Sequence, residues 1–414
     1  MRINLLFLIF LPLIFSSISS AQTGWYIIPG VTTESINDLN QGPGNLYWLA
    51  GNNGLIMKSS DAGKSWTQLN TGTNKNLKKM LQPASNQIWA AGDSGTVILS
   101  MNSGTDWDIV NPGTAANFRS VFSRGSGVAY VVGDTGSCYY TTDLGSNWET
   151  RTVPTSDNLN DGICPLSGSS AIALVGGTDG VIFKTTDAGI NWTSIPSGIS
   201  DDIYSFSFGP SGFVFASGAN GVILKSSDAG DSWSIVSTPT SEDLLSIDVS
   251  KQNANWLIAC GSNGTLLKST DVGTTWFLQG SPTTENLFCV YAASNSVHFA
   301  GGNNGILLKT TDGGGDPVNV EDEKVIPNDF SLSQNYPNPF NPSTTISFSI
   351  PDASFVSLKI FNALGEEIET LVAKELSAGN YQYEWNAKNL TSGIYFYTLT
   401  EGAFTQTYKM VLLK

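Results

Sequence analysis

Aspartates that recur at a fixed spacing are the first candidates for chemistry in this sequence. The stretch "GNNGLIMKSSDAGKSW" at residues 51–66 returns in variants such as "GTDGVIFKTTDAGINW" and "GSNGTLLKSTDVGTTW". A carboxylate at such a position could transfer protons, bind a metal ion, or accept hydrogen bonds within a turn. The repeated aspartates are Asp61, Asp143, Asp187, Asp228, Asp271 and Asp312.

The repetition favours a structural role for these aspartates. A residue type that recurs in nearly every copy rarely forms a single active site, and Asn102 replaces it in the second copy. An amide can still accept hydrogen bonds in a turn, whereas a metal or catalytic role needs the carboxylate. We therefore expect these side chains to accept hydrogen bonds from backbone N–H groups a few residues further on, and we assign no catalytic, cofactor-binding or metal-binding residue to them.

The period of the repeat indicates which elements carry these residues. A Gly-x-x-Gly motif recurs every 41 to 44 residues, and its first glycines are Gly51, Gly92, Gly133, Gly177, Gly218, Gly261 and Gly302. Each unit holds two short apolar runs before this motif, one after it, and one that begins at a tryptophan. Four strands in such a period are typical of a propeller blade. We expect the glycines to form a tight hairpin by adopting positive φ.

The last unit lacks its fourth strand, and the start of the chain can supply one. Pro317 stands where the seventh tryptophan is expected, while Trp25 lies 41 residues before Trp66 without a unit of its own. A segment around Trp25 that paired with the last blade would remove two open sheet edges. The prediction is an all-β, seven-bladed β-propeller closed by its N-terminal strand.

The turn sequence Ser/Thr-x-Asp-x-Gly-x-x-Trp resembles the Asp box of bacterial neuraminidase-type repeats. The array as a whole is similar to the photosystem II stability and assembly factor family, whose members are secreted seven-bladed rings with such turns. This resemblance concerns the repeat and implies no photosystem function. Sialidases of the Asp-box class need three arginines that converge from different blades, but Arg119, Arg124 and Arg151 come from neighbouring units. A sialidase-like or two-carboxylate glycosidase remains the alternative, and we expect His298 to be packed.

A second set of acids lies in the loops that join consecutive blades. These loops and the Gly-x-x-Gly hairpins are expected on one face, opposite the Asp boxes. The acids are Glu34, Asp157, Asp201, Asp202, Glu242, Asp243 and Glu285, and Lys75, Lys78 and Lys79 interrupt them. They are either polar loop residues that keep the protein soluble or a rim that binds a basic or glycan partner.

The two ends of the chain predict a route of export. Residues 1–21 have the arginine, the apolar run and the small residues of a signal peptide, and the run is too short for a membrane span. Residues 22–312 are assigned to the propeller, 313–330 to a linker, and 331–414 to a small Ig-like β-sandwich. Within the last segment, "NYPNPFNPSTTISFSIP", "LSAGNYQYEWNAKNLTSGIYFYTL" and "KMVLLK" resemble the C-terminal sorting domain of type IX secretion substrates of Bacteroidetes.

This second resemblance implies a partner and a location. The type IX secretion machinery would recognise residues 331–414, and the protein would reach the outer-membrane surface or the medium. The net charge of −15 and the absence of a basic stripe exclude nucleic acid binding. We expect the four cysteines to be mostly buried, free thiols. A disulfide between Cys260 and Cys289 is the alternative. The sequence thus predicts an exported, non-catalytic binding or scaffold protein without a cofactor, whose ligand is a protein or glycan on the propeller face.

Overall fold

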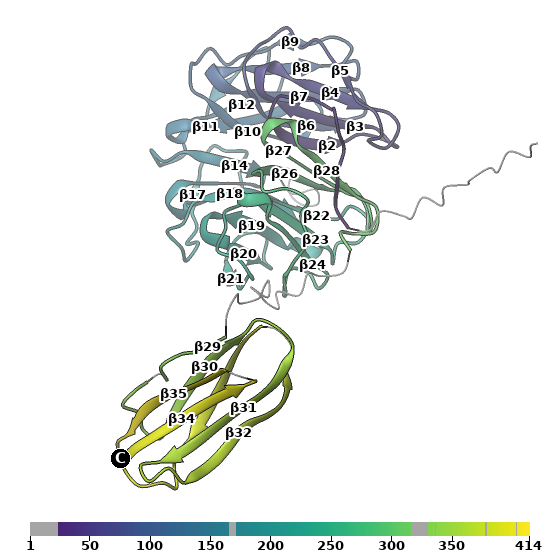
Figure 1. Ribbon diagram of the computed structural model, residues 1–414. Coiled ribbons are helices and arrows are strands. Elements are labelled where there is room, and N and C mark those ends of the chain that lie inside the picture. Colours follow the sequence, from purple (N-terminus) through teal and green to yellow (C-terminus); the bar gives the residue numbers. More distant parts are fainter. Residues whose placement is uncertain (1–23, 165–170, 316–329, 336, 377–378, 403) are drawn as a thin grey trace, which may run out of the picture. The chain divides into compact units, whose positions relative to one another are not determined.

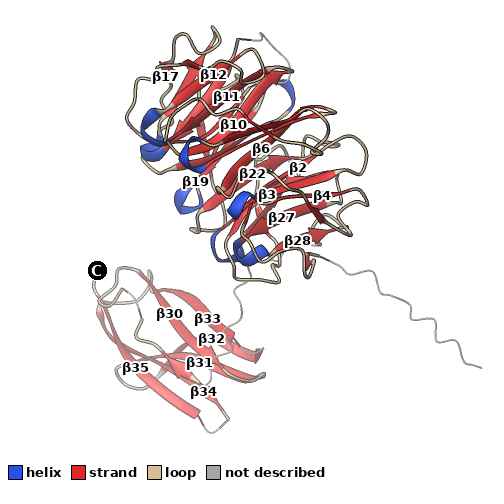
Figure 2. Cartoon of the chain, turned by 90° about the horizontal axis from the view of Figure 1, so that it is seen from above, coloured by secondary structure: helices blue, strands red, loops and turns tan. Residues whose placement is uncertain are grey.

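The computed structural model describes residues 24–164, 171–315, 330–335, 337–376, 379–402 and 404–414. The predicted signal peptide and most of the predicted linker lie outside these residues. The chain divides into two compact units, residues 1–318 and 319–414. Strands dominate both units, and the helical elements are short turns in the first (Figures 1 and 2).

The described part of the first unit forms seven four-stranded antiparallel sheets. Six of them use four consecutive strands, and the seventh takes its outer strand from the N-terminus. We number these sheets as blades 1 to 7 in the order of their first strands. From the first blade to the seventh the strands are β2 (Ile36–Gln41), β3 (Tyr47–Gly51), β4 (Ile56–Ser59) and β5 (Thr67–Gln68); β6 (Leu77–Ala84), β7 (Gln87–Gly92), β8 (Val97–Ser100) and β9 (Asp108–Ile109); β10 (Phe118–Gly125), β11 (Val128–Gly133), β12 (Cys138–Thr141) and β13 (Glu149–Thr150); β14 (Leu159–Ile163), β15 (Ala173–Gly177), β16 (Ile182–Thr185) and β17 (Thr193–Ser194); β18 (Ile203–Phe208), β19 (Val214–Gly218), β20 (Ile223–Ser226) and β21 (Ser234–Val236); β22 (Leu244–Val249), β23 (Leu257–Gly261), β24 (Leu266–Ser269) and β25 (Phe277–Leu278); and β26 (Leu287–Ala292), β27 (His298–Gly302), β28 (Leu307–Thr310) and β1 (Tyr26–Ile27).

The N-terminal strand β1 lies where the sequence predicts it. Tyr26 pairs with Lys309 of β28, and the Gly24 N–H donates to Asp312 Oδ2 at 2.7 Å. Trp25 is buried in a cluster with Ile258 and Leu266 of blade 6. Blade 1 in turn packs its first strand against blade 7, because Ile36 and Leu49 share a cluster with Phe299 and Leu307. The first and last blades are therefore neighbours in space.

The Gly-x-x-Gly motifs form short 3-10 turns between the second and third strands. The expectation that the first glycine of each motif adopts a positive φ is wrong. Gly51 has an extended φ of −163°, and the left-handed residues are Asn53 and Gly54. Gly51 is needed for space, because an added Cβ would lie 2.2 Å from the Ser35 carbonyl oxygen. The turns are η1 (Asn52–Gly54), η2 (Asp93–Gly95), η3 (Asp134–Gly136), η4 (Thr178–Gly180), η6 (Ala219–Gly221), η7 (Ser262–Gly264) and η8 (Asn303–Gly305), and η5 (Pro210–Gly212) lies at the other end of blade 5.

The glycine of each Asp box is also a contact point between blades. Gly63 has φ +77°, and a Cβ there would lie 2.6 Å from the ring of Phe299 in blade 7. The equivalent Gly104 faces Trp48 of blade 1, and Gly273 faces Phe215 of blade 5. The turn therefore packs against the preceding blade, which a larger residue would push away.

The second unit is a two-layer β-sandwich. One sheet has the order β29–β30–β33 and the other β32–β31–β34–β35. Its buried core includes Phe348, Leu358, Trp385 and Tyr397, and the Tyr397 hydroxyl donates to the Ser333 carbonyl at 2.7 Å. The strands are β29 (Ser331–Leu332), β30 (Ser343–Ile350), β31 (Ser354–Asn362), β32 (Glu367–Leu376), β33 (Gly379–Asn386), β34 (Gly393–Glu401) and β35 (Phe404–Leu412).

We predict that Trp25→Ala destabilises the propeller by about 3–5 kcal/mol, because it empties a large buried site between blades 6 and 7. Ile27→Ala, two residues further along the chain but 42% exposed, is the matched control and should cost less than about 1 kcal/mol. Chemical denaturation of the purified protein measures both. Equal effects of the two substitutions would show that β1 does not stabilise the last blade through Trp25.

Candidate functional site

A β-bulge near the start of each first strand shapes the central channel. The pairing of β2 with β3 skips one residue between Ile36 and Asp38, and the same shift occurs in β6, β10, β14, β18, β22 and β26. A bulge places two consecutive residues against one residue of the partner strand and re-aims their side chains. Each blade therefore contributes two consecutive residues to the channel wall.

The first residue of each pair forms the outer ring, which consists of Asn37, Lys78, Arg119, Asn160, Tyr204, Leu245 and Phe288. These side chains line a cavity of about 540 Å³, the outer mouth, together with residues of the Gly-x-x-Gly turns such as Asn52 and Asp93. The outer mouth therefore opens on the face that carries these turns and the acidic loops.

The wall of the outer mouth has two unlike halves. Blades 2 and 3 contribute the cations Lys78 and Arg119, whereas blades 5, 6 and 7 contribute Tyr204, Leu245 and Phe288. The Arg119 Nε donates to Asp134 Oδ1 at 2.8 Å. Lys78 forms no ion pair within the described part of the chain.

Two asparagines separate these halves and connect neighbouring blades. Asn37 Nδ2 donates to the Leu77 carbonyl at 2.8 Å, and Asn160 Nδ2 donates to the Ile203 carbonyl at 2.8 Å. They come from blades 1 and 4, so the cationic residues and the apolar residues occupy separate arcs of the mouth.

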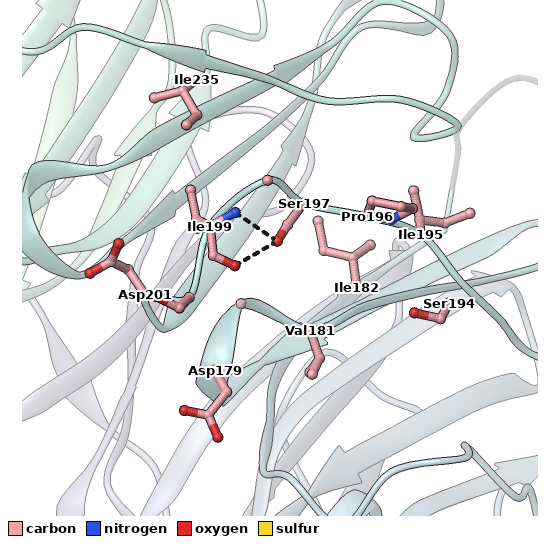
Figure 3. A pocket seen from close by; sticks show the side chains of 13 residues that line it. Asp179, Val181, Ile182, Ser194, Ile195, Pro196, Ser197, Ile199, Asp201 and Ile235 are labelled. Carbon is pink, nitrogen blue, oxygen red and sulfur yellow. Dashed lines mark hydrogen bonds between the residues drawn. The ribbon is translucent and has the colours of Figure 1, made fainter.

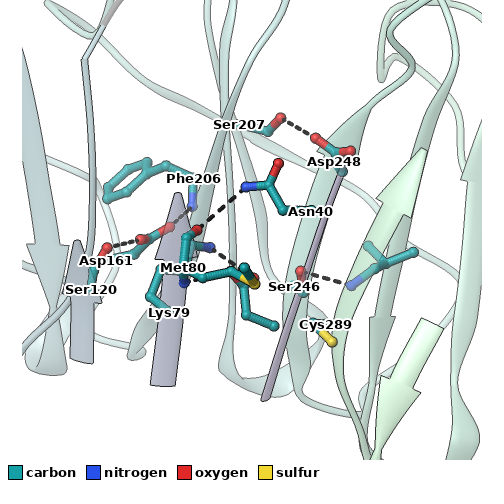
Figure 4. Close-up of polar contacts among 12 residues, drawn as sticks. Asn40, Lys79, Met80, Ser120, Asp161, Phe206, Ser207, Ser246, Asp248 and Cys289 are labelled. Carbon is teal, nitrogen blue, oxygen red and sulfur yellow. Dashed lines mark hydrogen bonds and ion pairs between the residues drawn. The ribbon is translucent and has the colours of Figure 1, made fainter. Parts of the chain in front are cut away.

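The second residue of each pair forms the inner ring, which consists of Asp38, Lys79, Ser120, Asp161, Ser205, Ser246 and Cys289. All but Ser120 line a constriction of about 80 Å³. Some of these side chains bind the backbone of the next blade, as Asp161 does with Phe206 in Figure 4. Asp38 Oδ2 accepts from the Met80 N–H at 2.8 Å, and Asp161 Oδ2 accepts from the Phe206 N–H at 2.8 Å.

Charges in the constriction shift one another's pKa. Burial raises the pKa of Asp38 to about 6, although Lys79 and the Met80 N–H oppose the shift. Burial alone would lower the pKa of Lys79, but Asp161 and Asp38 raise it above its usual value. Lys79 therefore remains an ammonium group held among carboxylates.

Beyond the constriction the channel widens again into a cavity of about 410 Å³, the vestibule. Gln82 and Phe208, which lie near the turns between first and second strands, contribute to its wall. Those turns meet the Asp boxes, since the Ala62 N–H donates to the Asn45 carbonyl. The vestibule and the outer mouth therefore open on opposite faces.

The Asp boxes lie away from the channel and form closed hydrogen-bond networks. Asp61 Oδ1 accepts from the Ser59 hydroxyl at 2.9 Å and from the Ser65 N–H at 2.9 Å, and the Ser65 hydroxyl donates to Oδ2 at 2.6 Å. Hydrogen bonds from Ser65 lower the pKa of Asp61. The same network surrounds Asp143, Asp187, Asp228 and Asp271, whereas Asp312 accepts from Gly24, Thr310, Gly314 and Gly315.

The second Asp box reverses one hydrogen bond. Asn102 Oδ1 accepts from the Ser100 hydroxyl and the Asp106 N–H, as the aspartates do. Its Nδ2, however, donates to Asp106 Oδ2 at 2.9 Å, whereas in blade 4 Asn191 Nδ2 donates to Asp187 Oδ2. The carboxylate and the amide have exchanged places, so the substitution keeps the network intact.

The predicted acidic rim lies on the face of the outer mouth, and most of its side chains bind the turns there. Glu34 accepts from Asn53 Nδ2 at 2.7 Å, and Asp243 Oδ1 accepts from the Asn220 N–H at 3.0 Å. The remaining contacts are Asp201 with Asn220 Nδ2, Asp202 with the Asp179 N–H, Glu242 with Asn263 Nδ2, Asp157 with the Thr155 hydroxyl, and the Glu285 N–H with the Thr283 hydroxyl. Lys78 and Lys79, expected in this rim, belong to the channel.

A separate surface groove of about 690 Å³ lies between the outer parts of blades 4 and 5 (Figure 3). Its wall includes Ile182, Ile195 and Ile199, and Ser197 is hydrogen-bonded to the backbone of Ile199. The groove mixes apolar and polar side chains and shares no residue with the channel cavities.

His298 is fully buried and not among the residues that line the channel cavities. Its ring lies 6.2 Å from that of Trp25, and neither ring nitrogen has a hydrogen-bond partner among the described residues. Burial lowers the pKa of His298 to about 4. The side chain is therefore neutral at pH 7 and packed, as the sequence predicts.

The described residues hold no metal-binding cluster, no disulfide and no membrane-spanning helix. No group of three or more His, Cys, Asp or Glu side chains is arranged there to hold a metal ion. Cys260 and Cys289 are free buried thiols, so the alternative disulfide between them is not formed. No described helix has the length and apolar character needed to cross a membrane.

Two family profiles match the chain. Residues 334–413 match the profile described as secretion system C-terminal sorting domain, and residues 227–345 match that of photosynthesis system II assembly factor YCF48. The chain carries a type IX C-terminal sorting domain behind a YCF48-like propeller. No curated protein matches the sequence. The sorting domain indicates export to the medium or the cell surface.

Solved structures show the same propeller fold. A structure described as YCF48 bound to D1 peptide is 21% identical, and the match covers 70% of this chain and 98% of that one with a TM-score of 0.58. YCF48 from Cyanidioschyzon merolae is 18% identical, and the match covers 69% of this chain and 98% of that one with a TM-score of 0.58. The GH74 xyloglucanase from Xanthomonas campestris is 11% identical, and the match covers 79% of this chain and 60% of that one with a TM-score of 0.57. These likenesses confirm the predicted propeller fold.

The exchanged Asp box yields a double-mutant test. Asn102→Asp should lower the Tm by about 2–4 °C, because it sets two carboxylates against each other. Adding Asp106→Asn should restore the Tm, since the pair would then match Asp187 and Asn191. Calorimetry of the two single variants and the double variant measures the coupling. Additive effects would contradict the proposed exchange.

The buried His298 predicts a loss of stability in acid. The unfolded chain takes up a proton near pH 6.5, whereas the folded chain does so only near pH 4. The free energy of unfolding should therefore fall by about 3 kcal/mol as the pH drops between these values. His298→Leu, which copies Leu257 at the equivalent position of blade 6, should lack this component. Denaturation at pH 7 and pH 4.5 tests it, and equal pH slopes would refute it.

Proposed function

We propose that this protein is an exported, non-catalytic binding protein whose propeller captures a polypeptide segment at the outer mouth. The observation that carries this proposal is the division of the outer ring into a cationic arc and an apolar arc. A ligand that satisfies both arcs needs an acidic group beside an apolar side chain. Lys78 would bind the carboxylate, while Tyr204, Leu245 and Phe288 would cover the apolar group.

The size and surroundings of the outer mouth fit a peptide segment. A volume of about 540 Å³ falls within the range of ligand pockets and admits a few residues. The acidic loops surround this opening, so basic residues that flank the inserted segment would face Glu34, Asp157 and Glu285. The proposed partner therefore has an apolar and acidic tip with basic flanks.

A relative of similar fold supports a peptide ligand. One solved YCF48 structure is described as bound to a D1 peptide. For the present chain we propose only the class of ligand, because the two propellers share 21% identity. The sorting domain would bring this binding surface to the outer-membrane surface or the medium, after recognition of residues 331–414 by the type IX machinery.

A glycan-cleaving hydrolase is the second candidate function. It is favoured by the xyloglucanase among the similar folds and by the carboxylates Asp38, Asp161 and Asp248 of the channel. Asp38 and Asp161 accept backbone hydrogen bonds from the next blade, a role that serves the ring. Turnover of a panel of sialosides and β-glucans would favour the hydrolase.

The binding proposal predicts a specific response to substitution. The probe is a dye-labelled peptide with a Phe-Asp core and flanking lysines, and its Phe-Asn counterpart is the ligand control. Lys78→Met should weaken binding of the acidic peptide at least tenfold, which equals about 1.4 kcal/mol. Lys75→Met, on the same face but outside the cavity, should change it less than twofold. Fluorescence anisotropy with the full chain measures the affinities.

Two outcomes would contradict this assignment. The first is equal affinity for the Asp and Asn peptides, because the cationic arc would then play no part. The second is undiminished binding by both Lys78→Met and Phe288→Ser, which would place the peptide elsewhere on the protein.

A further inference from the structure

The vestibule at the opposite end of the channel has its own charge balance. Three carboxylates line it, from Asp38, Asp161 and Asp248, against the two ammonium groups of Lys79 and Lys251. All three aspartates are at least nine-tenths buried. One negative charge therefore remains uncompensated in a confined space, where water screens it poorly.

The carboxylates are held in place by the protein backbone and by hydroxyl groups. Asp248 Oδ2 accepts from the Ala292 N–H at 2.9 Å, and its Oδ1 lies 2.8 Å from Lys251 Nζ. Asp161 Oδ1 accepts from the Ser120 hydroxyl at 2.7 Å. These bonds fix the carboxylates along the vestibule before any ligand arrives.

One hydroxyl at the floor of the vestibule, that of Ser205, has no partner among the residues that the structure describes. Ser205 is 4% exposed, lines both the constriction and the vestibule, and forms no side-chain hydrogen bond within the described residues. Its counterparts in the inner ring are engaged, since Ser120 donates to Asp161 and Ser246 accepts from the Val290 N–H. The Ser205 hydroxyl is therefore free to bind a group that enters the cavity.

Aromatic side chains make the wall suitable for a cation with an alkyl chain. Phe122, Phe206, Phe208 and Tyr291 line the vestibule. Lys251 already places its ammonium 5.3 Å from the centre of the Tyr291 ring. An ammonium group near an aromatic face is stabilised by the ring quadrupole, so this wall favours cations as well as alkyl groups.

We propose that the vestibule is a binding site for an alkylammonium group. The ammonium lies at the inner ring, where Asp38 and Asp161 supply charge and Ser205 supplies a hydroxyl acceptor. The alkyl chain extends along Phe206 and Tyr291 toward the opening. This site uses none of the outer-ring residues, so it is independent of the peptide site proposed above.

The test uses the full chain and simple probes. Isothermal titration with n-pentylammonium should show saturable binding that 1-pentanol, its uncharged counterpart, does not. Asp161→Asn keeps an acceptor for the Phe206 N–H but removes a charge, and it should weaken amine binding at least tenfold. Asp93→Asn, at the outer mouth, is the matched control and should leave the affinity unchanged.

A second variant predicts the opposite sign. Lys251→Met removes a competing cation, and the Lys251 side chain is 47% exposed, so folding should tolerate the change. Amine affinity should rise at least threefold. If Asp161→Asn fails to fold, Lys251→Met alone tests the proposed alkylammonium site. Unchanged or weaker binding by folded Lys251→Met would overturn the proposal, and so would equal binding of pentanol.

A further arm identifies the source of the amine. An acetylated, amidated lysine peptide is titrated beside n-pentylammonium. Binding of the peptide alone would identify a protein lysine as the ligand, and binding of the free amine would identify a small molecule. Either result supports the alkylammonium site, whereas the absence of binding by both overturns it.

Discussion

The first strand of each blade has one edge that faces the channel without a neighbouring strand, and the rest of the ring depends on how that edge is satisfied. Unpaired backbone groups that are shielded from water are costly. Here side chains from one blade bind the first strand of the next, as Asp38 does with Met80, Asp161 with Phe206, and Ser246 with Val290. Polar residues inside the channel therefore join the blades to one another.

This constraint also explains why charged groups are buried in the channel. A carboxylate that accepts a backbone hydrogen bond is partly compensated for the loss of water, and Lys79 compensates Asp38 and Asp161 further. The outer ring contributes less to this joining of blades. Asn37 and Asn160 bind the backbone of the next blade, whereas Lys78, Tyr204 and Phe288 form no such hydrogen bond within the described residues. The two ends of the channel can therefore differ in chemistry, with a cationic and apolar mouth on one face and an acidic and aromatic vestibule on the other.

The parts of the structure that follow from local sequence were predictable. The tryptophan spacing located the N-terminal strand of the last blade, and the serine, aspartate and glycine of each Asp box close their turn within seven residues of sequence. The sequence correctly marks the first glycines of the Gly-x-x-Gly motifs as necessary, but the reason it suggests, a positive φ, is wrong. Gly51 is extended, and its need for space beside Ser35 depends on a neighbouring strand that the motif itself does not contain.

The two rings of the channel were missed because an alternating strand pattern assigns only one of two consecutive residues to a given face. A bulge breaks that alternation, and no local sequence signal marks it. One comparison could have found the rings, since their members lie twelve and thirteen residues after successive tryptophans. The sequence places Lys78 and Lys79 in the loop rim, whereas in the structure they line the channel and the rim acids bind the adjacent turns.

Hydrogen–deuterium exchange of the full chain, with each class of probe in turn, tests most directly whether one channel carries two unlike binding ends. The acidic peptide should protect backbone amides in the loops and turns around the outer mouth, at residues 71–78, 93–95 and 112–119. The alkylammonium probe should instead protect residues 205–208, 246–251 and 290–292. Protection of the same segments by both probes, or protection confined to the β-sandwich, would contradict this account.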